Sequence, residues 1–224
     1  MFFLPIGCLI FVLFILFLPI LFILGYFHIL TLGFEKLGIS PEATLFLLLA
    51  ILIGSAINIP LAKKKLIYVQ ESRFFGLWHV PKIKAQGMAI NLGGAVIPIL
   101  LSFYFLYLTW LQGLEIKPIL IATALMIIVS KFLARVTPLP QGGGGVSIPA
   151  LIPPIFSAIF ALIFAPNFAA PCAFVAGTMG VLIGADILNL KKVQKYGGFL
   201  SIGGAGVFDG IFLVGIVSAL LTGF

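Results

Sequence analysis

Long apolar stretches, separated by short polar segments, run through the whole chain. Seven such stretches can be drawn in the 224-residue sequence: Phe2–Leu32, Ala43–Leu61, Met88–Leu111, Pro118–Leu133, Ile148–Ala165, Pro171–Leu190 and Leu200–Phe224. A helix needs about 20 mainly apolar residues to cross the hydrocarbon core of a bilayer. The pattern therefore predicts an all-α polytopic membrane protein, a bundle of about seven transmembrane helices that forms a single transmembrane domain over residues 1–224.

The composition excludes the soluble classes of protein. Hydrophobic residues make up 62% of the chain and charged residues 8%, whereas soluble domains carry roughly 25% charged residues. A soluble fold of this size cannot cover so much apolar surface. The first stretch lacks the basic start and the small-residue cleavage site of a signal peptide, so we interpret it as a retained spanning helix.

Lys and Arg residues gather after alternate apolar stretches. The basic residues at the end of, or after, the second, fourth and sixth stretches are Lys63, Lys64, Lys65, Arg73, Lys82, Lys84, Lys131, Arg135, Lys191, Lys192 and Lys195. The other segments hold only Lys36 and Lys117. An excess of basic residues marks cytoplasmic loops. We therefore expect a multi-pass protein of the cell inner (cytoplasmic) membrane, with the N-terminus in the cytoplasm and the C-terminus outside. The net charge of +7 then reflects orientation and contact with membrane lipids, and no nucleic-acid-binding pattern accompanies it.

Two segments depart from the pattern of spanning helices. Residues 62–87 form the longest loop, a cytoplasmic basic loop in which we expect a helix lying at the membrane interface. Residues 137–154 read TPLPQGGGGVSIPALIPP, and their consecutive glycines and repeated prolines exclude a regular helix. This glycine/proline-broken segment is either a cytoplasmic loop or a partly re-entrant segment that lines a cavity, because irregular backbone at membrane depth must be buried in protein or face water.

Cysteine and histidine offer no metal or cofactor site. Cys8 and Cys172 lie far apart in apolar stretches and are expected to be buried as small hydrophobic residues. His28 and His79 have no Cys, Asp or Glu at ligand spacing. We therefore expect no metal and no tightly bound cofactor, and the pattern leaves the oligomeric state open.

Asp186 and Asp209 are the only aspartates of the chain, and both lie in apolar, glycine-rich sequence. An aspartate at the centre of a spanning helix costs at least ~2.5 kcal/mol, so such a residue indicates a function. Asp186 stands about 7 Å from the basic boundary at Lys191, at ~1.5 Å per residue. Asp209 lies at the same depth if its helix begins near Gly204, so we expect the two carboxylates to face each other on consecutive antiparallel helices. The structural alternative is that each aspartate only caps a helix end or lies solvated in the headgroup zone.

Two carboxylates held close together in a low dielectric do not both ionise. One keeps the proton while the other stays charged, which supplies a general acid and a general base and activates a water held between them. The leading hypothesis is a di-aspartyl intramembrane hydrolase that cleaves a membrane-embedded peptide. The same acids can instead carry protons or bind Na⁺ in a transporter or channel. A third interpretation is a non-catalytic scaffold, in which Asn189 or Lys131 locks an aspartate between helices.

Three segments carry a resemblance to a known family: AGTMGVLIGADILNL, SIGGAGVFDGIFLVGIV and GGVSIPALIPP. Together they resemble a family of prokaryotic polytopic membrane proteins known as the domain of unknown function sixteen-fourteen. The resemblance covers most of the chain from about Pro138 onward. It implies a seven-helix type of membrane protein and no established activity.

A more distant resemblance is to the GxGD intramembrane aspartyl proteases, which include presenilins, signal peptide peptidases and prepilin peptidases. It implies that Asp186 and Asp209 are the catalytic pair, on helices of the same two directions as in presenilins. Pro149-Ala150-Leu151 is similar to the PAL motif of presenilins. In this chain the second aspartate stands two residues later than in GxGD, and the PAL triplet precedes both aspartates.

The hydrolase hypothesis also assigns a binding site for substrate. Gly203, Gly204 and Gly206 are expected to give backbone room for an extended substrate. Pro149, Ala150 and Leu151 are expected to present a free strand edge with which that substrate pairs.

Overall fold

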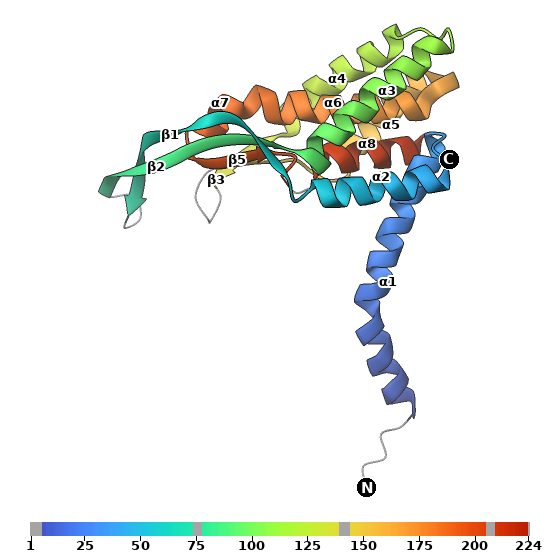
Figure 1. Cartoon of the computed structure of the whole chain (residues 1–224), viewed down its shortest axis with the longest axis horizontal. Coiled ribbons are helices and arrows are strands. Elements are labelled where there is room, and N and C mark those ends of the chain that lie inside the picture. Colours follow the sequence, from blue (N-terminus) through green and yellow to red (C-terminus); the bar gives the residue numbers. More distant parts are fainter. Residues whose placement is uncertain (1–5, 74–77, 139–143, 205–208, 224) are drawn as a thin grey trace.

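The computed structural model describes residues 6–73, 78–138, 144–204 and 209–223. The fold is mostly helical (Figure 1). The α-helices are α1 (Ile6–Lys36), α2 (Pro41–Gly54), α3 (Ile97–Leu111), α4 (Lys117–Leu133), α5 (Ile152–Phe164), α6 (Ala169–Val181), α7 (Leu190–Gln194) and α8 (Gly210–Leu221). Each of the apolar stretches contains at least one of these helices, so the prediction of a mainly helical fold is confirmed.

In the described part of the chain, four short non-α helices interrupt or extend this framework. They are the π-helix η1 (Leu92–Val96), the 3₁₀-helix η2 (Pro166–Phe168), the π-helix η3 (Leu182–Asp186) and the 3₁₀-helix η4 (Ile187–Asn189). Helix η1 leads into α3, and η3 and η4 connect α6 to α7.

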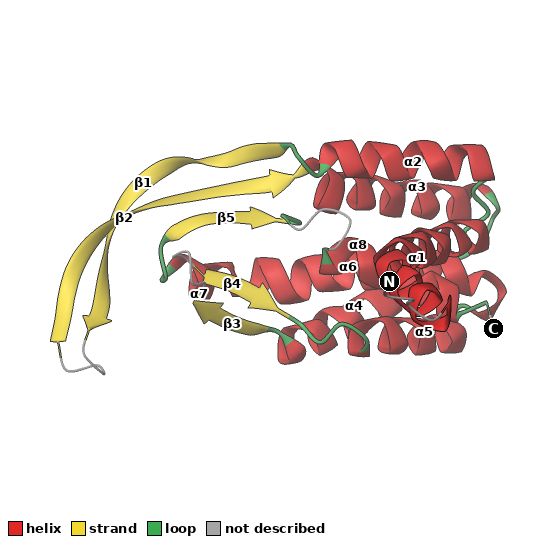
Figure 2. Ribbon diagram, turned by 90° about the horizontal axis from the view of Figure 1, so that it is seen from below, coloured by secondary structure: helices red, strands yellow, loops and turns green. Residues whose placement is uncertain are grey.

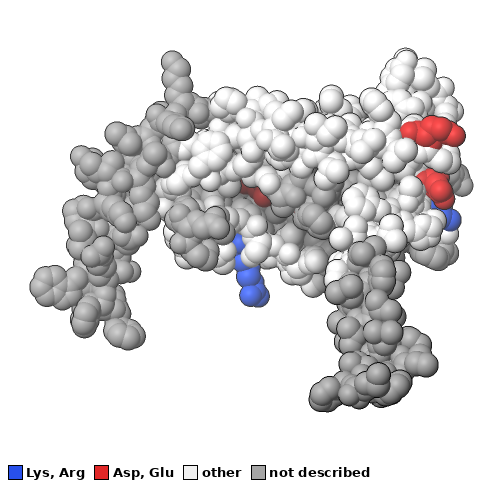
Figure 3. Space-filling view, turned by 60° about the horizontal axis from the view of Figure 1, so that its bottom comes forward, with Lys and Arg blue, Asp and Glu red and all other residues white. Residues whose placement is uncertain are grey.

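Two described helical stretches are long and apolar enough to cross a membrane, namely Leu92–Leu111 and Pro166–Gln194. The helices α2, α5 and α8 are apolar but shorter. Large hydrophobic side chains are exposed along the bundle, among them Phe46, Ile53, Leu100, Trp110, Phe132 and Ile163. Figure 3 shows a bundle face that is mostly uncharged, with charged side chains gathered at its right-hand end and a small patch of acidic atoms in a hollow. Exposed apolar surface of this extent is typical of contact with a membrane or a partner.

The prediction of an all-α fold is wrong in one respect, because the chain also forms strands. The strands β1 (Asn58–Arg73), β2 (Trp78–Asn91) and β5 (Gly198–Ile202) form a sheet in the order β1-β2-β5. Strands β1 and β2 are antiparallel, and β5 runs parallel to β2 from Gln86↔Gly198 to Ile90↔Ile202. Strands β3 (Arg135–Pro138) and β4 (Gly144–Ser147) form a separate antiparallel pair.

The interfacial helix expected within residues 62–87 is therefore not formed, since the described part of that loop lies in β1 and β2. Local sequence explains the difference. Ile67, Tyr68 and Val69 are β-branched or aromatic residues that favour strands, and Pro81 disfavours a helix interior. The segment 137–154 contributes β3, β4 and the start of α5. Figure 2 shows the strands extending from one end of the helical bundle.

Helix α6 is the central element of the bundle and packs against α3, α4, α5 and α8. Small residues let its neighbours approach closely, as in other membrane helix interfaces. A Cβ atom added to Gly180 would lie 2.5 Å from the Cβ of Met126 in α4, and one added to Gly177 would lie 3.0 Å from Val214 in α8. Phe105 of α3 and Phe174 of α6 pack edge to face, with ring centroids 5.2 Å apart. Glycine and aromatic contacts thus fix the bundle around one helix.

Replacement of Gly180 by alanine tests this packing. The added methyl group forces α4 and α6 apart, at a cost of about 1–3 kcal/mol, so we expect Gly180→Ala to lower the midpoint of thermal unfolding in detergent. Gly25→Ala in α1 is the matched control, because a Cβ there meets nothing within 4 Å and alanine favours helix. An unchanged midpoint for Gly180→Ala would contradict the close contact of α4 and α6.

Candidate functional site at the junction of bundle and strands

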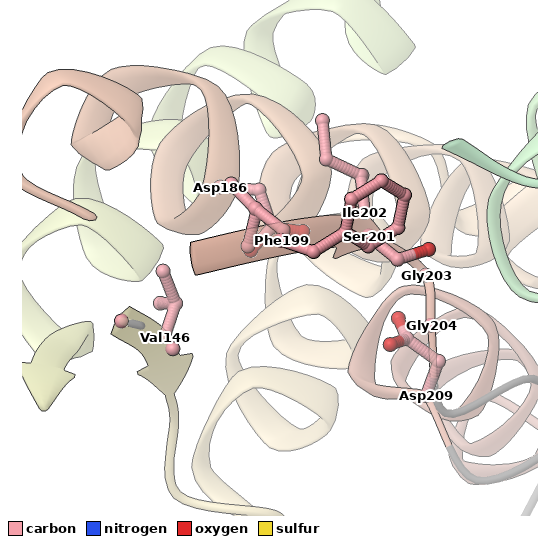
Figure 4. Close-up of a pocket in the computed structure, with 11 residues that line it drawn as sticks. Val146, Asp186, Phe199, Ser201, Ile202, Gly203, Gly204 and Asp209 are labelled. Carbon is pink, nitrogen blue, oxygen red and sulfur yellow. The ribbon is translucent and has the colours of Figure 1, made fainter. Parts of the chain in front are cut away.

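Asp186 and Asp209 line the same cavity, at the point where the helical bundle meets the strands (Figure 4). The cavity has a volume of about 230 Å³. Its other lining residues are Gly144, Gly145, Val146, Phe199, Leu200, Ser201, Ile202, Gly203 and Gly204. The two carboxylates are close enough to interact electrostatically. The structure thus brings together two residues that come from different helical segments.

Asp186 ends the π-helix η3, which continues α6 toward the cavity. Two residues earlier, Gly184 lies against α4, where an added Cβ would be 2.4 Å from the carbonyl oxygen of Ile127. Residues two apart in a helix point to roughly opposite sides, so Asp186 lies away from α4 and on the cavity side. π-helical turns occur frequently at functional sites.

Asp209 is the N-cap of α8 and does not lie inside the helix. The Ile211 backbone N–H donates to Asp209 Oδ1 at 2.9 Å. A carboxylate is a preferred N-cap and interacts favourably with the positive end of the helix dipole. The estimate that the helix begins near Gly204 is therefore wrong. Residues 198–202 form β5, and α8 begins only at Gly210.

The predicted substrate-binding glycines are placed differently from one another. Gly203 lines the cavity and has φ 71°, a conformation that favours glycine. A Cβ at Gly203 would lie 2.7 Å from the Cβ of Ala95, so this residue also needs to be glycine in order to pack on η1. Gly204 lines the cavity and is exposed, whereas Gly206 lies outside the described residues.

The strand edge predicted at Pro149, Ala150 and Leu151 is not formed, because these residues belong to no strand. Pro149, Ala150 and Leu151 are exposed residues between β4 and α5, and they are not among the residues that line the cavity. Strand β4, which directly precedes them, lines the cavity through Gly144, Gly145 and Val146. The Gly/Pro-rich segment thus contributes a wall of the cavity through its glycines.

A polar network that was not predicted holds β5, the opposite wall. The Ser201 hydroxyl donates to Asn58 Oδ1, which also accepts from Asn91 Nδ2 at 3.2 Å. Asn91 is fully buried, donates to the Ser55 carbonyl at 2.7 Å and accepts from the Gly94 N–H at 2.8 Å. The network ties β5 to the start of η1. Asn91 is the lone amide inside the apolar stretch Met88–Leu111, and this is the sequence signal that could have indicated the network.

Lys131 was a candidate partner for an aspartate, but its hydrogen bonds go elsewhere. Its ammonium donates to the Leu188 carbonyl and to Asn189 Oδ1, each at 2.7 Å. The contact between α4 and η4 is therefore a Lys–Asn pair. Within the described ranges, no cluster of three or more His, Cys, Asp or Glu residues could hold a metal ion. The functional groups that line the small cavity are two carboxylates and one hydroxyl, and two strands form part of its wall.

A sequence profile of one family matches residues 52–221, and its description reads Protein of unknown function (DUF1614). The chain belongs to this family. The DUF1614 match includes every residue that lines the cavity, and α1 lies outside it. No curated protein and no solved structure matches this DUF1614 chain. The resemblance to the family is confirmed, and the one to the GxGD proteases stays a prediction.

The capping role of Asp209 can be separated from any chemical role by substitution. Asp209→Ala removes the acceptor for the Ile211 N–H, and we expect it to reduce the free energy of unfolding by about 1 kcal/mol. Asp209→Asn keeps a cap of similar quality and should change stability by no more than a few tenths of a kcal/mol. Denaturant unfolding of both variants measures the difference. Equal stability of the Ala variant and the unsubstituted protein would show that the cap contributes nothing.

Proposed function

We propose that this DUF1614 protein is a di-aspartyl intramembrane hydrolase, in which Asp186 and Asp209 cleave a peptide bond of a membrane-embedded substrate. The observation that carries the proposal is the shared cavity. Two carboxylates that are costly to remove from water line one space at the end of the bundle, and strands β4 and β5 line the same space.

The surroundings of the two acids favour different roles for them. Asp209 accepts the Ile211 N–H at the N-terminus of α8, where an anion is stabilised, so we assign it as the general base. Asp209 takes a proton from water as the water oxygen attacks the peptide carbonyl carbon, and Asp186 gives its proton to the carbonyl oxygen. The C–N bond then breaks as the nitrogen receives the proton from Asp209, and Asp186 regains a proton from the gem-diol.

The strands give the substrate a means of binding in extended form. Strand β5 pairs with β2 on one side only, and no described residue pairs with its other edge. An extended peptide can add to such an edge through main-chain hydrogen bonds. A strand inserted between two others holds them about 9.6 Å apart. Some Cα atoms of β4 and β5 lie within 8 Å of each other, so a substrate strand does not fit between these two strands. We therefore propose that the substrate pairs with β5 alone.

The charge distribution supports a cleavage site near the cytoplasmic surface. Lys191, Lys192 and Lys195 follow Asp186 closely in sequence, and basic residues of this kind remain cytoplasmic. We propose seven spans, with the N-terminus in the cytoplasm and the C-terminus outside. Helices α2, α5 and α8 have 14, 13 and 12 residues, about 18–21 Å at ~1.5 Å per residue. They reach across a bilayer only with flanking residues or a locally thinner membrane.

A second candidate function is a proton- or sodium-coupled transporter that uses the same two aspartates. The observation that favours it is the broken helix at Asp186, where π and 3₁₀ turns replace α-helix. Interrupted helices with acidic residues bind coupling ions in secondary transporters. A non-catalytic scaffold is the third candidate, and it gains support from the Lys131–Asn189 contact between helices.

Two isosteric substitutions separate these functions. We expect purified protein in liposomes to cleave a transmembrane peptide, and Asp186→Asn and Asp209→Asn each to reduce the rate at least 100-fold, because each removes the acid or the base. Both variants should keep the unfolding midpoint of the unsubstituted protein. Cleavage that survives either substitution would exclude the proposed mechanism. Proton or Na⁺ flux that both substitutions stop, in the absence of cleavage, would identify the transporter instead.

The proposed pairing with β5 predicts a pattern in the substrate backbone. Successive N–H groups of a strand point to opposite sides, so only every second N–H of the bound peptide can bond to β5. The test uses peptides that carry one N-methyl group each and the Asp186→Asn variant as the binding protein. We expect the methyl group to weaken binding about 5- to 10-fold at every second peptide position, in line with ~1 kcal/mol per hydrogen bond. Equal loss at consecutive positions, or no loss at any position, would contradict pairing with one edge.

A further inference from the structure

A buried side chain hydrogen-bonds to the backbone directly before Asp186. Helix α6 gives way to the π-helix η3 and then to the 3₁₀-helix η4. The Asn189 side chain is almost fully buried, and its Nδ2 donates to the Ala185 carbonyl at 2.8 Å and to the Gly184 carbonyl at 3.5 Å. Asn189 thus supplies the carbonyls directly before Asp186 with a donor.

Lys131 of α4 fixes the orientation of that amide. Its ammonium donates to Asn189 Oδ1 and to the Leu188 carbonyl, each at 2.7 Å. A side-chain amide has one acceptor and one donor group. With the oxygen directed to Lys131, the nitrogen is directed to the carbonyls of Gly184 and Ala185.

The same turn also packs directly against the backbone of α4. Gly184 touches the α4 backbone so closely that an added Cβ would lie 2.4 Å from the Ile127 carbonyl oxygen. The glycine contact limits how far the turn can move from α4, and the Lys131–Asn189 pair fixes its hydrogen bonds. Asp186 is the next residue after the two carbonyls that Asn189 holds.

The geometry points to Lys131 and Asn189 as positioning residues that set the place of the Asp186 carboxylate in the cavity. A π-helical turn contains one residue more than an α-helical turn. If the π-helical turn converted to α-helix, Asp186 would rotate about the helix axis by the angle of one residue, roughly 100°. That rotation removes the carboxylate from the cavity. The catalytic consequence of this inference rests on the proposed function, whereas the position of the side chain does not.

The first test measures position without any catalytic readout. In a background with Cys8→Ser and Cys172→Ser, Asp186→Cys places a thiol at the site, and a small water-soluble maleimide reports its access to the cavity. We expect Lys131→Met to slow labelling of this thiol at least fivefold, and Lys131→Arg to restore most of the rate. Asn189→Asp, which keeps the acceptor for Lys131 and loses the Nδ2 donor, should slow labelling as well.

Two controls separate positioning from general damage to the fold. Lys117→Met removes the same charge from the other end of α4, where Lys117 is exposed, and should leave labelling within twofold. A thiol introduced by Ser201→Cys on the opposite wall of the cavity should label equally fast with and without Lys131→Met. Unchanged labelling of the Asp186→Cys thiol in both Lys131→Met and Asn189→Asp would overturn the inference.

The second test uses the proposed reaction. Lys131→Met and Asn189→Asp should lower kcat for peptide cleavage at least tenfold with KM within twofold, because the strand edge that binds substrate is unchanged. Lys131→Arg should recover most of kcat. A loss confined to KM would overturn the positioning role. Slower labelling in a protein that cleaves no peptide would support the positioning of Asp186 and refute the hydrolase.

Discussion

Backbone polar groups in a low-dielectric interior must be hydrogen-bonded, and this requirement governs the site. π-helical turns take the place of regular α-helix at two points near the cavity, η1 and η3, and a buried asparagine supplies hydrogen bonds at each. Asn91 caps η1 by accepting the Gly94 N–H, and Asn189 donates to the carbonyls before Asp186. An unpaired buried group would cost about 1–3 kcal/mol, so these amides stabilise the irregular backbone there.

The two π-helical turns support different walls of the cavity. Helix η3 carries Asp186, while η1 supports the turn at Gly203, whose missing side chain allows contact with Ala95. Strand β5 is tied to η1 through Ser201, Asn58 and Asn91. Both walls are therefore attached to the closely packed helical bundle around α6. A rigid frame of this kind is what acid–base chemistry needs, since reacting groups must be held within hydrogen-bond reach.

The sequence was sufficient for the helical class and for the two acids, because both follow from general rules. Apolar stretches mark helices by length, and a rare carboxylate in apolar sequence indicates a function. The strands could not be predicted in the same way. Most of residues 198–202 and 88–91 lie within apolar stretches that predict helices, and pairing in the sheet β1-β2-β5 makes them strands.

The supporting residues of the site were predicted least well. The sequence shows Lys131 and Asn189 as polar residues in apolar surroundings, and from it we expected each of them to pair with an aspartate. Three-dimensional placement of α4 beside η4 decides that they bond to one another. Asp209 was expected within a helical segment, and its role as N-cap depends on where β5 ends and α8 begins. Such details depend on tertiary packing, which overrides local pattern.

The central claim is that Asp186 and Asp209 face one cavity, and a cross-link between the two positions tests it most directly. In protein with Cys8→Ser and Cys172→Ser, the pair of substitutions Asp186→Cys and Asp209→Cys would place a thiol at each site. A short, water-soluble bifunctional thiol reagent should join the two thiols within one chain. Thiols that each react singly but are never joined would contradict the account.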